Sequence, residues 1–155
     1  MKDYIDIEHI LEELKFNVKF NKQMDGSGKI SGNTILIDSS ENKERQRFSM
    51  AHELGHAMQN VRHANRNDDS NDYSVADRKD EVFANTFAAQ FLMPKSMVVL
   101  EVNTSIKENN YDQRRLTDQN VKSIISDVAR KLKVSTMAMK YRMDNLGIFV
   151  PVEDK

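Results

Sequence analysis

The sequence predicts an α+β fold, in which a small antiparallel sheet packs on a helical core and further helices follow. Two observations support this prediction. Short segments with strand-like composition lie within the first 40 residues, whereas apolar residues recur at helical spacing from residue 41 onward. In addition, a chain of 155 residues with 39% hydrophobic residues is long enough to bury one respectable core.

The N-terminal part predicts one helix and a sheet. Residues 6–15 carry apolar side chains at helical spacing, and residues 16–20 alternate as a half-buried strand does. A turn with two glycines follows, and after it come two β-rich pieces at residues 29–31 and 34–38. We expect these pieces to form a small antiparallel sheet.

Two long helices are expected in the middle of the chain. Ser39 and Ser40 are candidate N-caps for a helix over residues 41–61. The next segment, residues 62–76, is rich in Asn and Asp and predicts a long surface loop. A second helix follows Asp77 and ends near Met93, because Pro94 cannot continue it.

The C-terminal part predicts helices over residues 95–101, 117–132 and 135–146. The last two resemble a helix-turn-helix, and residues 113–142 hold eight Lys and Arg against two Asp, a net charge of +6. DNA binding is therefore an alternative reading of this segment. The near-neutral charge of the whole chain, −1, argues against it.

We expect a single metallopeptidase domain over residues 1–155, for reasons that the next paragraphs give. Its parts would be the helix and sheet of residues 1–40, the two metal-binding helices of residues 41–94, and the helices of residues 95–155. The chain has no long apolar run of membrane-span length and no secretory leader pattern at its start, so we expect a cytoplasmic protein.

The absence of cysteine restricts any metal site to His, Asp and Glu ligands. His52-Glu53-Leu54-Gly55-His56 matches the motif H-E-x-x-H, in which two histidines four residues apart point from one helix face toward one ion. Met50, Leu54 and the apolar residues after them lie on the opposite face. A single histidine on an apolar face would be an ordinary core residue, but this pattern does not fit that reading.

A catalytic zinc ion needs a third protein ligand. Glu81 is favoured, because it belongs to a separate helix whose same face continues through small alanines. Asp80 points about 100° away from that face, and His63 lies about two turns beyond His56. Asn85, one turn after Glu81, could orient a ligand through a hydrogen bond or simply pack.

Three sequence blocks resemble the ImmA/IrrE family of metallopeptidases. They are RFSMAHELGH at residues 47–56, EVFANTFAAQFLMP at residues 81–94 and VSTMAMKYRMDNLG at residues 134–147. The second block is the most diagnostic, because nothing generic requires it to follow an H-E-x-x-H helix. In the third block Met143 replaces the usual leucine, which conserves volume.

The resemblance implies a thermolysin-like site in which one Zn²⁺ is held by His52, His56 and Glu81 and Glu53 is the catalytic base. It also implies that the substrate is a helix-turn-helix transcriptional repressor of a mobile element or a stress response, whose cleavage relieves repression. The residue that stabilises the oxyanion is not assigned by the sequence; the candidates are Tyr73, His63 and Tyr111.

In one further alternative the chain binds a metal ion but catalyses no reaction. The chain would then be a catalytically silent, zinc-stabilised regulatory module that binds protein or DNA. The intact Glu53 argues against it, as does the preference of structural zinc sites for four protein ligands. Other divalent metals could also occupy such a site.

Overall fold

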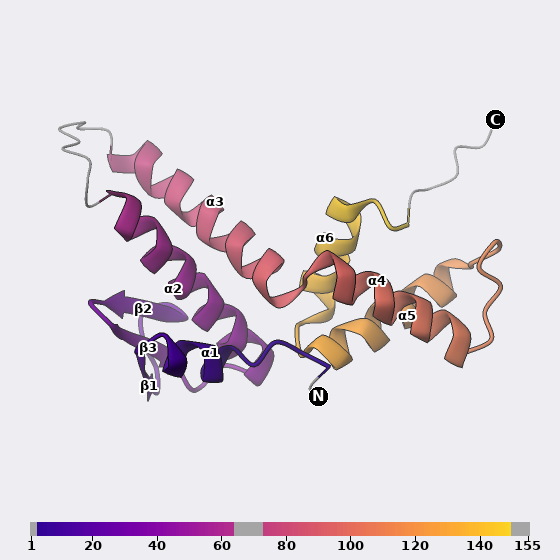
Figure 1. Cartoon of the computed structure of the whole chain (residues 1–155), viewed down its shortest axis with the longest axis horizontal. Coiled ribbons are helices and arrows are strands. Elements are labelled where there is room, and N and C mark those ends of the chain that lie inside the picture. Colours follow the sequence, from indigo (N-terminus) through magenta and orange to yellow (C-terminus); the bar gives the residue numbers. More distant parts are fainter. Residues whose placement is uncertain (1–2, 64–72, 150–155) are drawn as a thin grey trace. The chain divides into compact units, whose positions relative to one another are not determined.

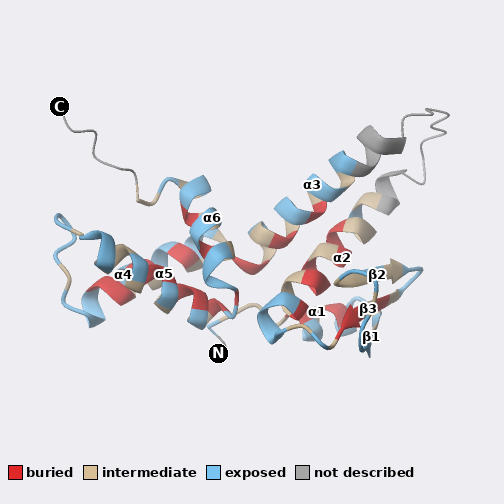
Figure 2. Cartoon of the chain, turned by 180° about the vertical axis from the view of Figure 1, so that it is seen from behind, coloured by how far each residue is buried: buried red, intermediate tan, exposed pale blue. Residues whose placement is uncertain are grey.

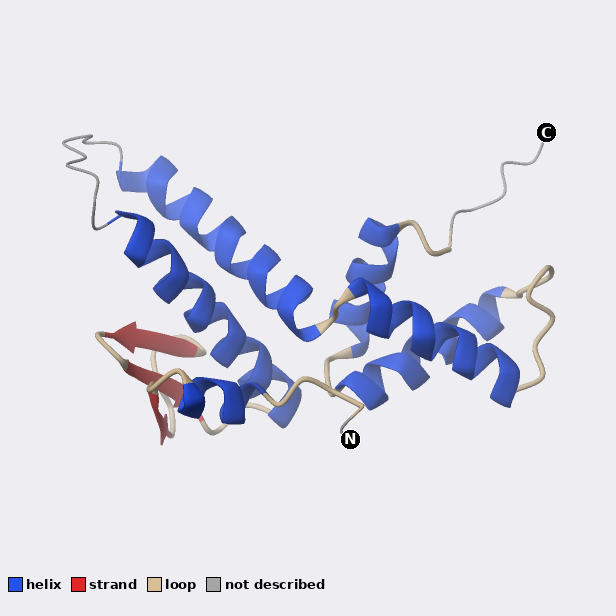
Figure 3. Ribbon diagram, viewed as in Figure 1, coloured by secondary structure: helices blue, strands red, loops and turns tan. Residues whose placement is uncertain are grey.

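The computed structural model describes residues 3–63 and 73–149, and its α+β architecture confirms the predicted fold class (Figures 1 and 3). It forms two compact units, Asp6–Leu92 and Met93–Lys155 with the residues up to Ile5. The expectation of a single domain stays a prediction. Among the described residues, no helix is both long and apolar enough to cross a membrane.

The elements are α1 (Ile7–Glu13), β1 (Asn17–Asn21), β2 (Gly28–Ser31), β3 (Thr34–Asp38), α2 (Lys43–His63), α3 (Tyr73–Leu92), α4 (Lys95–Glu108), α5 (Asp118–Leu132) and α6 (Thr136–Leu146).

The sheet is mixed, which corrects the expectation of an antiparallel sheet. Its order is β1-β3-β2. β2 and β3 form an antiparallel hairpin with Ile30 opposite Ile35, but β1 pairs with β3 in parallel, with Val18 opposite Ile35. Alternation along a strand shows which face is buried and not which direction its neighbour runs. Because β3 lies in the middle of the sheet, β2 is an edge strand.

One face of the sheet supports the core of the first unit. Ile35 and Ile37 of β3 are fully buried, as are Ile7 and Leu11 of α1. Asp6 caps α1 by accepting a hydrogen bond from the backbone N–H of His9. This small core gives α2 an apolar surface on which to pack.

The start of α2 differs from the sequence prediction. Asn42, and neither Ser39 nor Ser40, accepts a hydrogen bond from the backbone N–H of Arg45 at 2.8 Å. Ser40 instead donates from both its backbone and its hydroxyl to Asp38, and these two bonds lower the pKa of the Asp38 carboxyl. The helix consequently begins at Lys43, two residues after the predicted start.

α2 and α3 lie side by side in an extended pair (Figure 1). Gly55 of α2 faces Ala84 of α3, and a Cβ at Gly55 would stand 3.1 Å from the Ala84 Cα and 3.1 Å from the Phe87 ring. Ala84 and Ala88 are fully buried. Small residues on both helices therefore allow their backbones to approach closely.

The second unit contains α4, α5 and α6. α4 ends at Glu108, seven residues beyond the predicted end, because its buried face continues through Val102 and Ile106. Figure 2 shows buried residues along all three helices. The other helix ends of this unit agree with the prediction to within one residue: Ser135 caps α6, and Gly147 ends it in the left-handed conformation at φ 66°. In the first unit α3 begins at Tyr73, before the predicted start after Asp77.

Candidate metal centre

Two helices of the first unit bring three potential metal ligands together. His52 and His56 lie one turn apart on α2, and Glu81 reaches them from α3. The His52 Nε2 and His56 Nε2 atoms are 3.1 Å apart. The Glu81 carboxylate places Oε2 at 3.2 Å from His52 Nε2 and Oε1 at 2.9 Å from His56 Nε2. The three side chains thus converge on one point.

These separations fit a tetrahedral cation. Ligand atoms about 2.0–2.2 Å from a zinc ion lie about 3.4 Å from each other. Direct hydrogen bonding explains the arrangement less well, because each ring nitrogen has one in-plane direction in which to donate or accept. Here each Nε2 atom faces both the other Nε2 atom and a carboxylate oxygen. The donor set of two imidazoles and one carboxylate leaves a fourth position open.

Packing of α2 explains why these imidazoles face outward. Met50 and Leu54 are each 1% exposed and direct the opposite side of the helix into the core. The imidazoles are partly exposed, at 16% for His52 and 20% for His56, whereas the Glu81 side chain is 58% exposed. The site therefore opens to solvent from the α3 side.

Electrostatics at the site favour neutral imidazole and a more basic carboxylate. Burial lowers the pKa of His52, an effect that the Glu81 charge opposes. A neutral imidazole is the form that coordinates a metal. Burial also raises the pKa of the Glu53 carboxyl, and the side chain is only 6% exposed. A carboxylate with a raised pKa is a better proton acceptor.

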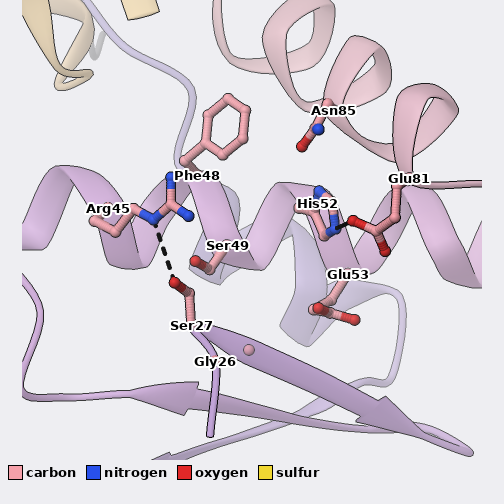
Figure 4. A pocket seen from close by; sticks show the side chains of 10 residues that line it. Gly26, Ser27, Arg45, Phe48, Ser49, His52, Glu53, Glu81 and Asn85 are labelled. Carbon is pink, nitrogen blue, oxygen red and sulfur yellow. Dashed lines mark hydrogen bonds and ion pairs between the residues drawn. The ribbon is translucent and has the colours of Figure 1, made fainter. Parts of the chain in front are cut away.

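A pocket of about 400 Å³ lies beside these residues (Figure 4). The close view shows His52 and Glu81 at one end and Arg45 with Phe48 at the other. The lining residues are Gly26, Ser27, Gly28, Arg45, Phe48, Ser49, His52, Glu53, Glu81 and Asn85. A Cβ at Gly28 would stand 3.4 Å from the Glu53 Oε1 atom, so this glycine keeps the floor of the pocket clear.

Comparison with known families supports a peptidase-like site. The sequence matches the family described as the IrrE N-terminal-like domain, Peptidase_M78, over residues 12–144. The chain belongs to this family. It therefore carries a metallopeptidase-like domain, and the resemblance drawn from its sequence blocks is confirmed. Among the curated proteins, none matches this chain.

A solved structure shows the same fold as this IrrE N-terminal-like domain. It is a Mycobacterium tuberculosis transcriptional regulator, with a TM-score of 0.61 and 13% sequence identity. The alignment covers 89% of this chain and 39% of that chain. The IrrE N-terminal-like chain thus spans about two fifths of the length of that regulator, and the likeness concerns the fold alone.

The other candidates of the sequence analysis do not join the cluster. Among the described residues, Asp80 is not part of the group that could hold a metal ion. α2 continues without a break to His63, so the Cα atom of His63 lies about 10 Å along the helix axis from the Cα atom of His56. The side chains of His63 and Tyr73 lie outside the described part of the chain, and Tyr111 belongs to the other unit. Asn85 faces His52, and its hydrogen bond raises the pKa of that imidazole.

Sequence reasoning missed the far half of the pocket. Arg45 precedes His52 by seven residues, a spacing that places both on one face of α2 and could have identified it. Ser27 and Gly28 could not have been found in this way, because only the tertiary packing of the hairpin on α2 brings them to the site.

Proposed function

We propose that this chain is a zinc-dependent endopeptidase that cleaves a helix-turn-helix transcriptional repressor. The observation that carries the proposal is the convergence of His52, His56 and Glu81 within 3.2 Å of one another beside the buried Glu53. Family membership supports peptidase chemistry. The likeness to a transcriptional regulator supports a regulatory role.

The chain's own residues would perform the proton transfers. A zinc ion held by the two histidines and Glu81 would act as a Lewis acid, lowering the pKa of water and polarising the scissile carbonyl. Glu53 accepts a proton as water attacks that carbonyl and then donates it to the departing amine. Its burial supports this role because its pKa is raised toward the working pH. Asn85 holds His52 in orientation.

The substrate would bind as an extended strand. β2 is an edge strand, so its outer backbone groups are available to pair with a peptide. β2 begins at Gly28, which lines the pocket next to Glu53. A peptide paired with β2 would therefore pass in front of the carboxylate. Backbone pairing of this kind gives affinity with limited sequence selectivity.

The test compares wild-type protein with Glu53→Gln, each loaded with zinc, against a helix-turn-helix repressor encoded beside this gene. Glu53→Gln removes the base, keeps the shape of the side chain and leaves the proposed ligands intact. We expect both proteins to bind about one zinc per chain. We expect cleavage by wild type and a loss of at least about a hundredfold in rate for the variant.

Glu44→Gln is the matched control, because Glu44 is an exposed residue on the first turn of the same helix. It should cleave at the wild-type rate. Equal cleavage by Glu53→Gln would show that another group is the base. If wild type binds zinc and cleaves no candidate repressor, the silent regulatory module becomes the better description.

A further inference from the structure

We propose that Arg45 is a specificity-determining residue, which selects substrates with an acidic side chain two to three residues from the scissile bond. The proposal rests on the peptidase function above and adds the chemistry of the substrate. It follows from the position, charge and unused hydrogen-bonding capacity of one side chain in the pocket.

Arg45 is the one cationic side chain among the described residues that line the pocket. Its Nε atom donates a hydrogen bond to the Ser27 hydroxyl at 3.3 Å and lies 3.5 Å from the Glu41 carboxylate. Its terminal nitrogens have no hydrogen-bond partner among the described residues. Because the side chain is 55% exposed, these two nitrogens are accessible to a ligand.

The unused nitrogens suit a carboxylate. A guanidinium group presents parallel N–H donors that match the two oxygens of a carboxylate, and such paired bonds are short and directional. Ser27 accepts a hydrogen bond from Nε and so restricts the orientation of the guanidinium. Figure 4 shows the group above the Ser27 hydroxyl, and Phe48 also lines the pocket.

The spacing sets the position of the acidic residue. Arg45 lies seven residues before His52 on a continuous helix, so their Cα atoms are about 10 Å apart along the axis. An extended peptide advances about 3.3 Å per residue, and this distance corresponds to about three residues. The Arg45 side chain reaches away from α2 toward Ser27, so we expect the acidic residue two or three residues from the scissile bond.

The local charges favour an acidic ligand at this end. Glu41 is the only carboxylate that the structure places in contact with Arg45 among the described residues, and at 3.5 Å it leaves the terminal nitrogens unpaired. Glu53 and Glu81 lie at the opposite end of the pocket. An acidic substrate side chain therefore meets a cation here, whereas a lysine at the same position would meet a like charge.

The experiment uses quenched fluorescent octapeptides of neutral residues, each with one Asp or one Lys at a defined position. The zinc-loaded full chain is compared with Arg45→Gln, Arg45→Glu and the control Lys43→Gln, an exposed cation on the same helix that does not line the pocket. Mass spectrometry locates the bond that is cut. We expect wild type and the control to prefer Asp about fivefold at the position two or three residues from that bond.

Arg45→Gln should lose this preference, and Arg45→Glu should prefer Lys instead. An unchanged preference for Asp in both variants, or none in wild type, overturns the proposal. Binding of the same sequences, labelled with a fluorophore and no quencher, to zinc-loaded Glu53→Gln is measured by fluorescence anisotropy. It separates this result from failure of the peptidase function. Asp peptides should bind about fivefold more weakly when Arg45→Glu is added, and equal binding overturns the role of Arg45 even if nothing is cleaved.

Discussion

The two units of the chain differ in the polar residues that they bury. In Asp6–Leu92, the buried polar residues among those described are Asp38, Gln46, Ser49 and Glu53. In the described part of the other unit the only buried polar residue is Ser105, and it donates a hydrogen bond to Asp127 at 2.8 Å. Burying a polar group lowers stability unless a partner compensates.

The contrast separates residues that hold the fold from residues that we propose to perform chemistry. The core of the second unit is apolar, and side-chain caps begin α5 at Thr117 and α6 at Ser135. The first unit buries Glu53 against a pocket and holds three partly exposed potential ligands within 3.2 Å of one another. A ligand that binds only the folded state would stabilise this unit.

Binding of zinc should raise the free energy of unfolding, and this is the largest effect we expect. At a free concentration 1,000 times the dissociation constant, a ligand that binds only the folded state stabilises it by about 4 kcal/mol. Wild type should gain this amount in chemical denaturation with zinc, and His56→Ala should gain almost none, because one of the three proposed ligands is gone.

His9→Ala is the matched control, since His9 lies on the exposed side of α1 and away from the cluster. It should gain as much from zinc as wild type does. An equal gain in His56→Ala would place the metal elsewhere and would remove the contrast between the two units.

A smaller effect is expected where α2 and α3 approach each other. Gly55→Ala adds a methyl group 3.1 Å from the Ala84 backbone and 3.1 Å from the Phe87 ring. The helix gains about 1 kcal/mol from alanine, but overpacking costs about 1–3 kcal/mol, so we expect a net loss of about 1 kcal/mol. Urea denaturation of the variant measures the difference.

Phe87→Leu tests the cause of this loss. If the Phe87 ring is what the new methyl group meets, the double variant should lose less stability than the two single variants together. Strictly additive losses would show that the ring is not the cause and that the Ala84 backbone and the Cβ of residue 87, which lies 3.2 Å from the new methyl group, account for the effect. A gain in stability from Gly55→Ala would contradict the close approach of the helices.

Much of the candidate site could be predicted because it depends on spacing within single helices. Residues four apart, such as His52 and His56, lie on one face of any α-helix. The alanines after Glu81 indicated which face of the second helix approaches α2. Arg45 belongs to the same class of signal, although we recognised it only in the structure.

The parts that could not be predicted depend on contacts between distant segments. The parallel pairing of β1 with β3 requires the chain to return across the sheet, and strand composition does not encode that direction. The length of α4 could not be predicted because most residues after Glu101 are polar. Ser105 is buried among them through its hydrogen bond to Asp127 of α5. Asn42 and not Ser40 caps α2, because Ser40 donates its hydrogen bonds to Asp38.

The smallest effect is expected in the second unit. Thr117 caps α5 by accepting from the Asn120 N–H at 3.0 Å, while the Asn120 side chain accepts from the Thr117 N–H at 3.2 Å. Thr117→Ala should lower the free energy of unfolding by about 1 kcal/mol, and Thr117→Ser should retain most of it. Denaturation with and without zinc measures both variants.

The loss caused by Thr117→Ala should be the same with and without zinc, and the zinc content of the folded protein should not change. The cap and the metal cluster share no described partner, and effects of independent sites add. A loss that doubles when zinc is removed would mean that the second unit supports the site directly. The proposed separation between a unit that supports the fold and a unit that carries the candidate metal site would then fail.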